Sequence, residues 1–237
     1  MIDLYYAPTP NTWKVSILLE ECGLAYRVIP VDILAGDQKK PEFLAINPNG
    51  RVPAIVDHEG PDAPLPVFES GAILIYLAEK TGRFLARAGR ARAETLSWLM
   101  WQMGGLGPIA GQAHHFRRYA PPGNEYSVER FVKETARLYG VLDERLSSNE
   151  WLAADSYSIA DMACWGWVWF HRMQGQNLDN FPWVARWFFA ISARPAVRRA
   201  RTVGLDNLSE EARARLTGPF YEAATNAPHT DGSVGWT

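Results

Sequence analysis

The first 80 residues alternate between short strand-like and longer helix-like patterns of apolar positions. Residues 2–6 place apolar side chains at every second position, as in a strand that is buried on one face. A turn follows, and a helix is predicted up to Gly23, because apolar residues recur three or four positions apart: Val15, Leu18, Leu19 and Cys22. Residues 26–31 form the next predicted strand. The order strand–helix–strand favours a parallel pair of strands.

The next segment predicts two further strands and a helix. Residues 53–57 form a short apolar strand, and residues 59–66 contain the glycine and prolines of a turn. A fourth strand ends at Phe68. A helix then begins near Ser70 and ends at Gly82. This part of the chain therefore has the order strand–strand–helix.

No strand is predicted beyond about residue 90, where apolar residues recur with helical spacing. A long helical stretch over residues 93–116 is interrupted by glycines and a proline at 104–108, which predict a kink or a break. Ser158 and Asp161 have the spacing of a capping box, which we assign to folding rather than to chemistry. Further helices are predicted at residues 128–146, from residue 158 onwards and at 182–193.

These patterns divide the chain of 237 residues into an α/β domain and an all-α domain. The α/β domain is predicted to span residues 1–82 and the all-α domain residues 89–205. A polar tail over residues 206–237 is expected to be poorly ordered unless it docks. With 47% hydrophobic and 21% charged residues, the chain is able to bury a sizeable core.

Charge and cysteine content exclude several classes of protein. The formal net charge of −2 gives no reason to expect nucleic acid or an anionic membrane as a partner. Residues 1–10 lack the pattern of a signal peptide, and no apolar run approaches the roughly 20 residues that span a bilayer. Cys22 and Cys164 are too few for a disulfide framework. We therefore expect them to be buried apolar residues in a protein of the reducing cytoplasm.

Two polar pairs stand at predicted helix starts, where free N–H groups and a partial positive charge occur. Thr9 and Asn11 stand at the entry to the first helix and are able to donate to a ligand. Glu69 and Ser70 begin a later helix, where a hydroxyl and N–H groups suit a carboxylate and Glu69 suits an ammonium. Taken alone, each pair is more simply explained as a helix cap.

A third polar segment, Asn49 to Ala54, contains Pro53 at the start of a predicted strand. Proline has no N–H, so the strand ladder stops there and the backbone of Val52 is available to an extended peptide. This interpretation gains if the bond between Val52 and Pro53 is cis, as in only about 5–6% of X-Pro bonds. Taken alone, the segment is more often a routine loop.

The order and spacing of these segments resemble the glutathione transferase superfamily. The motifs N-P-x-x-x-V-P, E-S-x-A-I and S-I-A-D-M-A occur in this order, and the resemblance covers roughly residues 1 to 200. The motifs A-P-T-P-N, V-D-H, W-Q-M-G-G-L-G-P and H-H-F are similar to the nu class, whose members use glutathione to reduce disulfide bonds. The resemblance implies a thioredoxin-like N-terminal domain, an all-helical C-terminal domain and a homodimer.

The resemblance also implies roles for the polar pairs. Thr9 and Asn11 match the residues placed beside the glutathione sulfur. Glu69 and Ser70 match the residues that bind the γ-glutamyl end.

Further ligand contacts are implied in the same way. Val52 matches the residue before the cis proline, here Pro53, and its backbone pairs with the cysteinyl part of glutathione. Gln38 matches a polar residue that meets the glycine or peptide portion. Arg130 matches a basic residue that reaches the ligand, in one arrangement across a dimer.

The chemistry expected at this site requires no side-chain base. Residues 8–11 contain no cysteine or serine, and Tyr5 and Tyr6 belong to the first strand. A thiol has a pKa of about 8.5 and reacts as the thiolate. Donors from Thr9, Asn11 and the helix start are therefore predicted to lower the thiol pKa of glutathione. Without a protein cysteine, glutathione must serve as both the attacking and the resolving thiol.

A second-substrate pocket is predicted between the domains. Its candidate lining residues are His114, His115, Phe116 and Trp167. The two histidines are more simply explained as a surface pair, and the ten tryptophans as core. No metal site is expected, because adjacent residues on a helix point about 100° apart.

The leading functional hypothesis is a glutathione-dependent disulfide-bond reductase that acts on a small-molecule disulfide. One alternative is a transferase that conjugates glutathione to electrophiles or reduces peroxides, and it would use the same ligand-binding residues. Another alternative is a non-catalytic glutathione-binding or partner-binding module. The intact set of polar residues argues against this last alternative.

Overall fold

The computed structural model describes residues 1–60, 62–205 and 210 of the chain, and its N-terminal part is built on a four-stranded sheet. The strand order is β2-β1-β3-β4, with β1 parallel to β2 and antiparallel to β3, and with β4 antiparallel to β3. The predicted parallel pair is therefore confirmed. The strands are β1 (Ile2–Tyr6), β2 (Tyr26–Pro30), β3 (Ala54–Asp57) and β4 (Leu65–Phe68).

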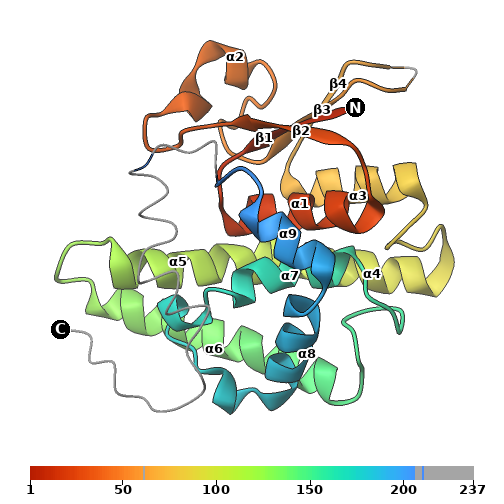
Figure 1. The fold of residues 1–237 in the computed structure, drawn as a ribbon. Helices are drawn as coiled ribbons and strands as arrows, with labels where there is room; N and C mark the ends of the chain where they lie inside the picture. The colour runs from red at the N-terminus through yellow and green to blue at the C-terminus, as the bar shows by residue number, and fades with distance from the viewer. Residues whose placement is uncertain (61, 206–209, 211–237) are drawn as a thin grey trace.

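Two helices of the N-terminal part, α1 (Pro10–Cys22) and α3 (Ser70–Thr81), lie between the sheet and the helical part of the molecule (Figure 1). Each ends at a glycine with a φ of 66°, Gly23 after α1 and Gly82 after α3. Glycine adopts this left-handed conformation without the steric cost of a Cβ atom, so both predicted helix ends are confirmed.

A short segment between β2 and β3 was not predicted as helical. It contains the 3₁₀ turn η1 (Asp37–Lys39) and the single-turn helix α2 (Pro41–Leu44), which lies on the side of the sheet away from α1 and α3 (Figure 1). Only Phe43 of this pair of turns is buried. One buried residue gives no periodic pattern, which explains why the sequence did not reveal the segment.

The rest of the described chain, up to residue 205, is helical and contains no strand. Of the predicted kink or break near residues 104–108, the break is wrong, because the backbone remains helical there and forms a π-helical segment, η2 (Gln102–Leu106). Such a widened turn occurs mostly as a single turn inside an α-helix, often at a functional site. The elements are α4 (Gly89–Trp101), η2 (Gln102–Leu106), α5 (Gly107–Arg118), α6 (Glu125–Ser147), α7 (Ile159–Val168), η3 (His171–Gln174), η4 (Leu178–Asn180), α8 (Pro182–Ser192) and α9 (Pro195–Thr202).

The two parts share one aromatic core. Trp13 of α1 is fully buried, stacks on Phe170 with ring centroids 5.5 Å apart, and packs against Trp165 of α7 and Trp169. This packing holds the start of α1 against the helical part. Within the described residues, no helix is both long and apolar enough to cross a bilayer. The predicted tail lies outside the described residues, apart from residue 210.

Candidate functional site

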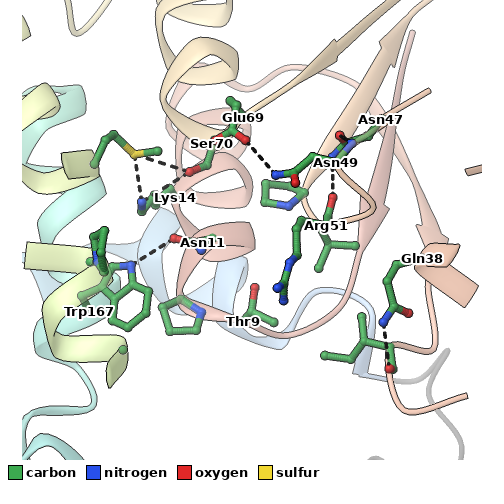
Figure 2. Close-up of a pocket in the computed structure, with 18 of the residues that line it drawn as sticks. Thr9, Asn11, Lys14, Gln38, Asn47, Asn49, Arg51, Glu69, Ser70 and Trp167 are labelled. Atoms are coloured by element: carbon green, nitrogen blue, oxygen red, sulfur yellow. Dashed lines mark hydrogen bonds between the residues drawn. The ribbon is translucent and has the colours of Figure 1, made fainter. Parts of the chain in front are cut away.

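A cleft of about 790 Å³ lies between the sheet-containing part and the helical part. The starts of α1 and α3 and the loop before β3 form one wall, while η2, α5 and α7 contribute the opposite wall (Figure 2). The structure brings eight of the predicted site residues together in this cleft: Thr9, Asn11, Gln38, Val52, Pro53, Glu69, Ser70 and Trp167.

Four other predicted residues do not line the cleft of their own chain. Arg130 is exposed on α6, and His115 is exposed on α5. His114 stacks on Phe170 with ring centroids 6.1 Å apart, and burial lowers its pKa to about 4. Phe116 is half-buried on α5. The structure therefore does not bring His114, His115 and Phe116 beside Trp167 in the cleft.

The start of α1 presents a fixed donor to the cleft. Thr9 is the N-cap, and its hydroxyl accepts a hydrogen bond from the Thr12 N–H at 3.2 Å. The Asn11 Oδ1 atom accepts a hydrogen bond from the Trp167 Nε1–H at 3.0 Å (Figure 2). An indole nitrogen only donates, so the acceptor must be the amide oxygen. This contact leaves the two N–H groups of the Asn11 amide available for a ligand.

The loop before β3 offers an extended backbone to the cleft. The bond between Val52 and Pro53 is cis, and the ladders of β3 with both neighbouring strands begin only at Ala54. Asn47 holds the loop, because its side chain donates to the Arg51 carbonyl at 2.6 Å and accepts from a backbone N–H two residues later. The peptide groups around Val52 therefore face the cleft instead of a strand.

The start of α3 combines backbone strain with an open helix end. Glu69 has a φ of 66° and a ψ of 115°, a sparsely populated conformation outside the left-handed helical region, and such backbone strain costs about 1–3 kcal/mol. No side chain caps α3, and the buried hydroxyl of Ser70 lies at its first turn. The Asn49 side chain donates to the Glu69 carboxylate at 3.3 Å. Strain of this kind persists where the surrounding structure holds it, as it often does at ligand sites.

Lys14 is a site residue that the sequence analysis missed. It lies on α1, is only 1% exposed and lines the cleft. Its ammonium donates to Gln102 Oε1 at 2.7 Å, to Ser70 Oγ at 3.3 Å and to Met103 Sδ at 3.3 Å. Burial lowers the pKa of Lys14 to about 7, against the opposing effects of Cys164 and the Glu69 carboxylate.

A signal for Lys14 was present in the sequence. It precedes the buried residues Ile17 and Leu18 by three and four positions, so it falls on the apolar stripe of α1. A charge on a buried stripe is rarely found without a partner or a function. Arg51, an exposed residue at the cleft, was also missed, although it belongs to the motif that identified the loop.

Neither cysteine lines the cleft. Cys22 lies at the far end of α1, where its thiol contacts the Thr81 hydroxyl at 3.5 Å. Cys164 is fully buried in α7. Burial raises the pKa of both thiols, and that of Cys164 well above its ordinary value. Among the described residues, no group of three histidines, cysteines or carboxylates is placed to hold a metal ion.

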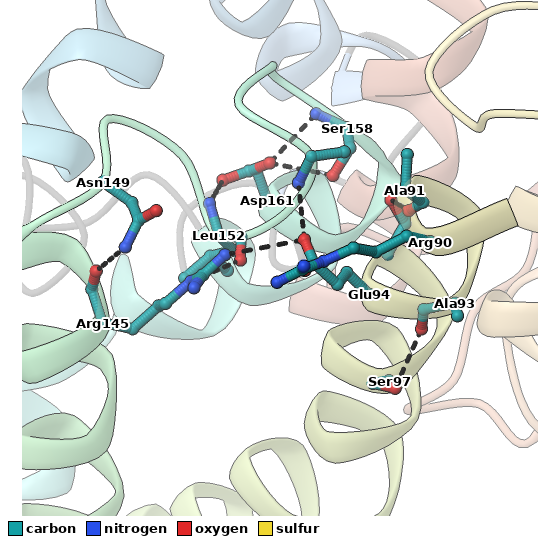
Figure 3. A network of polar contacts seen from close by, with 12 residues as sticks. Arg90, Ala91, Ala93, Glu94, Ser97, Arg145, Asn149, Leu152, Ser158 and Asp161 are labelled. Carbon is teal, nitrogen blue, oxygen red and sulfur yellow. Dashed lines mark hydrogen bonds and ion pairs between the residues drawn. The ribbon is translucent and has the colours of Figure 1, made fainter.

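A second polar cluster lies at the start of α7, outside the cleft. Asp161 is fully buried and accepts hydrogen bonds at 3.0 Å from the Leu152 N–H and from the backbone N–H and hydroxyl of Ser158 (Figure 3). It also accepts one from the Trp187 indole at 2.9 Å. The predicted capping box is confirmed. Its polar atoms bond to one another and to nearby backbone, as expected of a feature that serves folding.

The fold and the cleft define a member of a known enzyme family. The model of the glutathione S-transferase N-terminal domain matches residues 1–79, and that of the C-terminal domain matches residues 107–195. The chain therefore belongs to the glutathione S-transferase family of enzymes. Its N-terminal domain is thioredoxin-like and its C-terminal domain is helical, as predicted.

Individual relatives are also highly similar. The chain is 54% identical over 202 residues to the disulfide-bond oxidoreductase YfcG of Escherichia coli, covering 84% of this chain and 94% of the relative. A glutathione transferase family member from Pseudomonas fluorescens, solved with two glutathione bound, is 47% identical with a TM-score of 0.80. That alignment covers 84% of this chain and 92% of the other.

A glutathione transferase from Pseudomonas putida was solved with one glutathione disulfide bound per subunit. It is 44% identical to this chain with a TM-score of 0.81, and the alignment covers 85% of this chain and 91% of the other.

Proposed function

We propose that this protein is a glutathione-dependent disulfide-bond reductase that uses no cysteine of its own. The observation that carries the proposal is the contrast between the cleft and the cysteines. The first turn of α1 presents Asn11 to the cleft, while Cys22 and Cys164 are elsewhere and have raised pKa values. The name of the E. coli relative and the ligands of the two solved Pseudomonas proteins support the same reading.

Glutathione is proposed to bind with its sulfur at the start of α1. The Asn11 amide N–H groups, the Thr9 hydroxyl and the helix start would donate to the sulfur and favour the thiolate. The extended backbone at Val52 would pair with the cysteinyl residue. Ser70 and Glu69 would hold the carboxylate and the ammonium of the γ-glutamyl end.

The proposed reaction needs two glutathione molecules for each disulfide. A first thiolate attacks one sulfur of the disulfide, forms a mixed disulfide and releases the other sulfur as a thiolate. A second glutathione thiolate attacks the glutathione sulfur of the mixed disulfide, which gives oxidised glutathione and a second released thiolate. Each released thiolate takes one proton. The cleft volume of about 790 Å³ lies within the roughly 300–1,000 Å³ range of ligand pockets, and the similar Pseudomonas fluorescens protein was solved with two glutathione bound.

A homodimer belongs to the same proposal. Arg130 is exposed on α6 and does not line the cleft of its own chain, which is consistent with a role at the ligand of a second subunit. Sedimentation of the purified protein would give its assembly state. Weaker glutathione binding by Arg130→Ala, with the dimer intact, would support the role, whereas unchanged binding would contradict it.

Steady-state kinetics would test the proposed activity. We expect glutathione to reduce 2-hydroxyethyl disulfide much faster than it reacts with 1-chloro-2,4-dinitrobenzene, and a faster second reaction would favour the conjugating transferase.

The double variant Cys22→Ser, Cys164→Ala should keep most of the reductase activity. If it is folded but inactive, the cysteine-free mechanism is wrong. No heat of binding with either form of glutathione would instead favour the non-catalytic module.

A further inference from the structure

Lys14 occupies a position that the proposed reaction has not yet used. Its side chain extends from α1 to the first turn of α3 and to η2, so it links these three elements at the wall of the cleft. Lys14 and Ser70 are each at least 96% buried. Figure 2 shows the two side chains joined at the place where α3 begins.

The contacts of Lys14 fit an ammonium. An ammonium has three N–H donors and no acceptor, and three acceptors surround it: Gln102 Oε1, Ser70 Oγ and Met103 Sδ. A neutral amine would have only two donors for these three acceptors, so the contacts favour the ammonium, whereas burial favours the neutral amine. The Ser70 oxygen accepts from Lys14, and its own hydrogen is donated to Met103 Sδ at 3.7 Å. A thioether sulfur is a weak acceptor, so a carboxylate in the cleft would compete well for this hydrogen. The serine hydroxyl then links the buried cation to whatever acceptor the cleft holds.

Among the described groups that act on Lys14, only the Glu69 carboxylate is an anion, so a second anion in the cleft would be attracted to the ammonium. The described titratable groups that act on it are the Glu69 carboxylate, before α3, and the Cys164 thiol, on α7. Burial keeps the thiol of Cys164 protonated, because it raises the pKa of that group well above its ordinary value. The segment η2 contributes only the uncharged Gln102 and Met103. The helix α9 also packs on α1, and Arg194, just before α9, and Arg199, on α9, are both paired with glutamates of α1.

We propose that Lys14 is a positioning residue that acts through Ser70 on the α-carboxylate of the γ-glutamyl group, and that binding of this carboxylate makes Lys14 take up a proton. This inference rests on the proposed function, since it requires glutathione in the cleft. A carboxylate near a cation favours the charged form. Near neutral pH the empty site therefore holds a mixture of amine and ammonium, and the occupied site holds ammonium.

Proton uptake on binding can be measured by titration calorimetry in buffers of different ionisation enthalpy. S-methylglutathione is the suitable probe, because it has no thiol that would release a proton. The matched ligand is 4-aminobutyryl-S-methylcysteinylglycine, which has the same chain without the α-carboxylate. At pH 7 we expect uptake of about half a proton per site with the first ligand and none with the second.

A pair of variants locates the proton. Lys14→Met should bind S-methylglutathione more weakly and without proton uptake, whereas Lys133→Met, which removes an exposed lysine of α6, should retain the uptake. Uptake with both ligands, uptake with neither, or uptake that persists in Lys14→Met would each overturn the inference. If Lys14→Met does not fold, the comparison of the two ligands on the unchanged protein decides alone.

The same titration separates this inference from the proposed function. If glutathione and S-methylglutathione both fail to bind, the proposed function is wrong and the inference falls with it. If they bind without proton uptake, the proposed function stands and the role of Lys14 is wrong.

Discussion

The helices α7 and α3 both begin with a serine beside an acidic residue, yet their starts differ in how many polar groups are already satisfied. At the start of α7, Asp161 and Ser158 bond to each other, the Ile159 N–H donates to the Phe84 carbonyl at 3.1 Å, and the Ala160 N–H donates to Ser158 Oγ. This start is buried in the core.

At the start of α3, by contrast, no side chain of the described residues accepts from the first backbone N–H groups. No side chain caps it, Glu69 is held at a φ of 66°, and the buried Ser70 hydroxyl faces the cleft beside Lys14. The first N–H groups of a helix have no partner within the helix. A serine at a helix start is therefore structural where neighbouring groups use every donor, and indicates a ligand site where they leave donors open.

The largest expected effect is a loss of stability when Asp161, which holds the start of α7, is replaced. Asp161→Ala leaves the Leu152 N–H, the Ser158 N–H and the Trp187 indole unpaired in the core, so the free energy of unfolding should fall by about 3 kcal/mol. Urea denaturation measures this loss. Calorimetry below the unfolding transition should give unchanged glutathione affinity, and a weaker affinity would place this cluster in the ligand site.

The next largest effect is expected at the start of α1. Asn11→Ala removes the donor to the thiolate, and the reductase kcat should fall by about 100-fold, as for other lost donors to a developing anion. Asn11→Asp is the matched control, because it keeps an oxygen for the Trp167 indole while the donor is lost. It should be at least as inactive as Asn11→Ala. An active Asn11→Asp enzyme would mean that Asn11 serves only to bind Trp167.

A smaller effect, on the KM for glutathione, is expected when the Ser70 hydroxyl at the start of α3 is removed. Ser70→Ala removes the link between Lys14 and the bound carboxylate, so the KM for glutathione should rise by about 10-fold with little change in kcat. Ser158→Ala, the equivalent change at α7, should lower stability and leave KM unchanged. Equal KM values for the two variants would contradict the proposal that the start of α3 binds the ligand and the start of α7 serves folding alone.

A further prediction is a pH dependence of stability. Lys14 has a pKa of about 7 in the folded protein and a higher pKa when unfolded, so the unfolded chain binds more protons between these values. The free energy of unfolding should therefore rise with pH above 7, by at most about 1.4 kcal/mol per pH unit. Compared with Lys14→Met, the unchanged protein should gain stability between pH 7 and 9. Parallel pH profiles would contradict the lowered pKa.

Much of the fold was predictable because its signals are local. The alternation in residues 2–6, the helical spacing before Gly23 and the capping box at Ser158 each concern a few neighbouring residues. The single buried residue of the turns η1 and α2 left no such pattern. At residues 104–108 the glycines and proline indicated an irregularity, but not that the backbone would remain helical.

The cleft was predictable only in part, because its remaining contacts join distant segments. The bond between Asn11 and Trp167 spans 156 positions, and that between Lys14 and Gln102 spans 88. They depend on how α1 packs against α7 and η2, which no short pattern encodes. His114 was predicted to line a pocket between the domains together with Trp167, whereas its ring stacks on Phe170. Its pairing with Phe170 has no sequence signal.

The burial of Cys164 and the remote position of Cys22 have a consequence for how the enzyme responds to oxidation. In the proposed reaction every reacting sulfur is supplied from solution, so the protein would have no oxidised resting form for another reductase to restore. Such a turnover would require two encounters with the same small thiol, so flux would fall more steeply than the thiol concentration when a cell is depleted of it. The catalyst itself would survive such an episode unchanged and resume work as soon as the pool recovers.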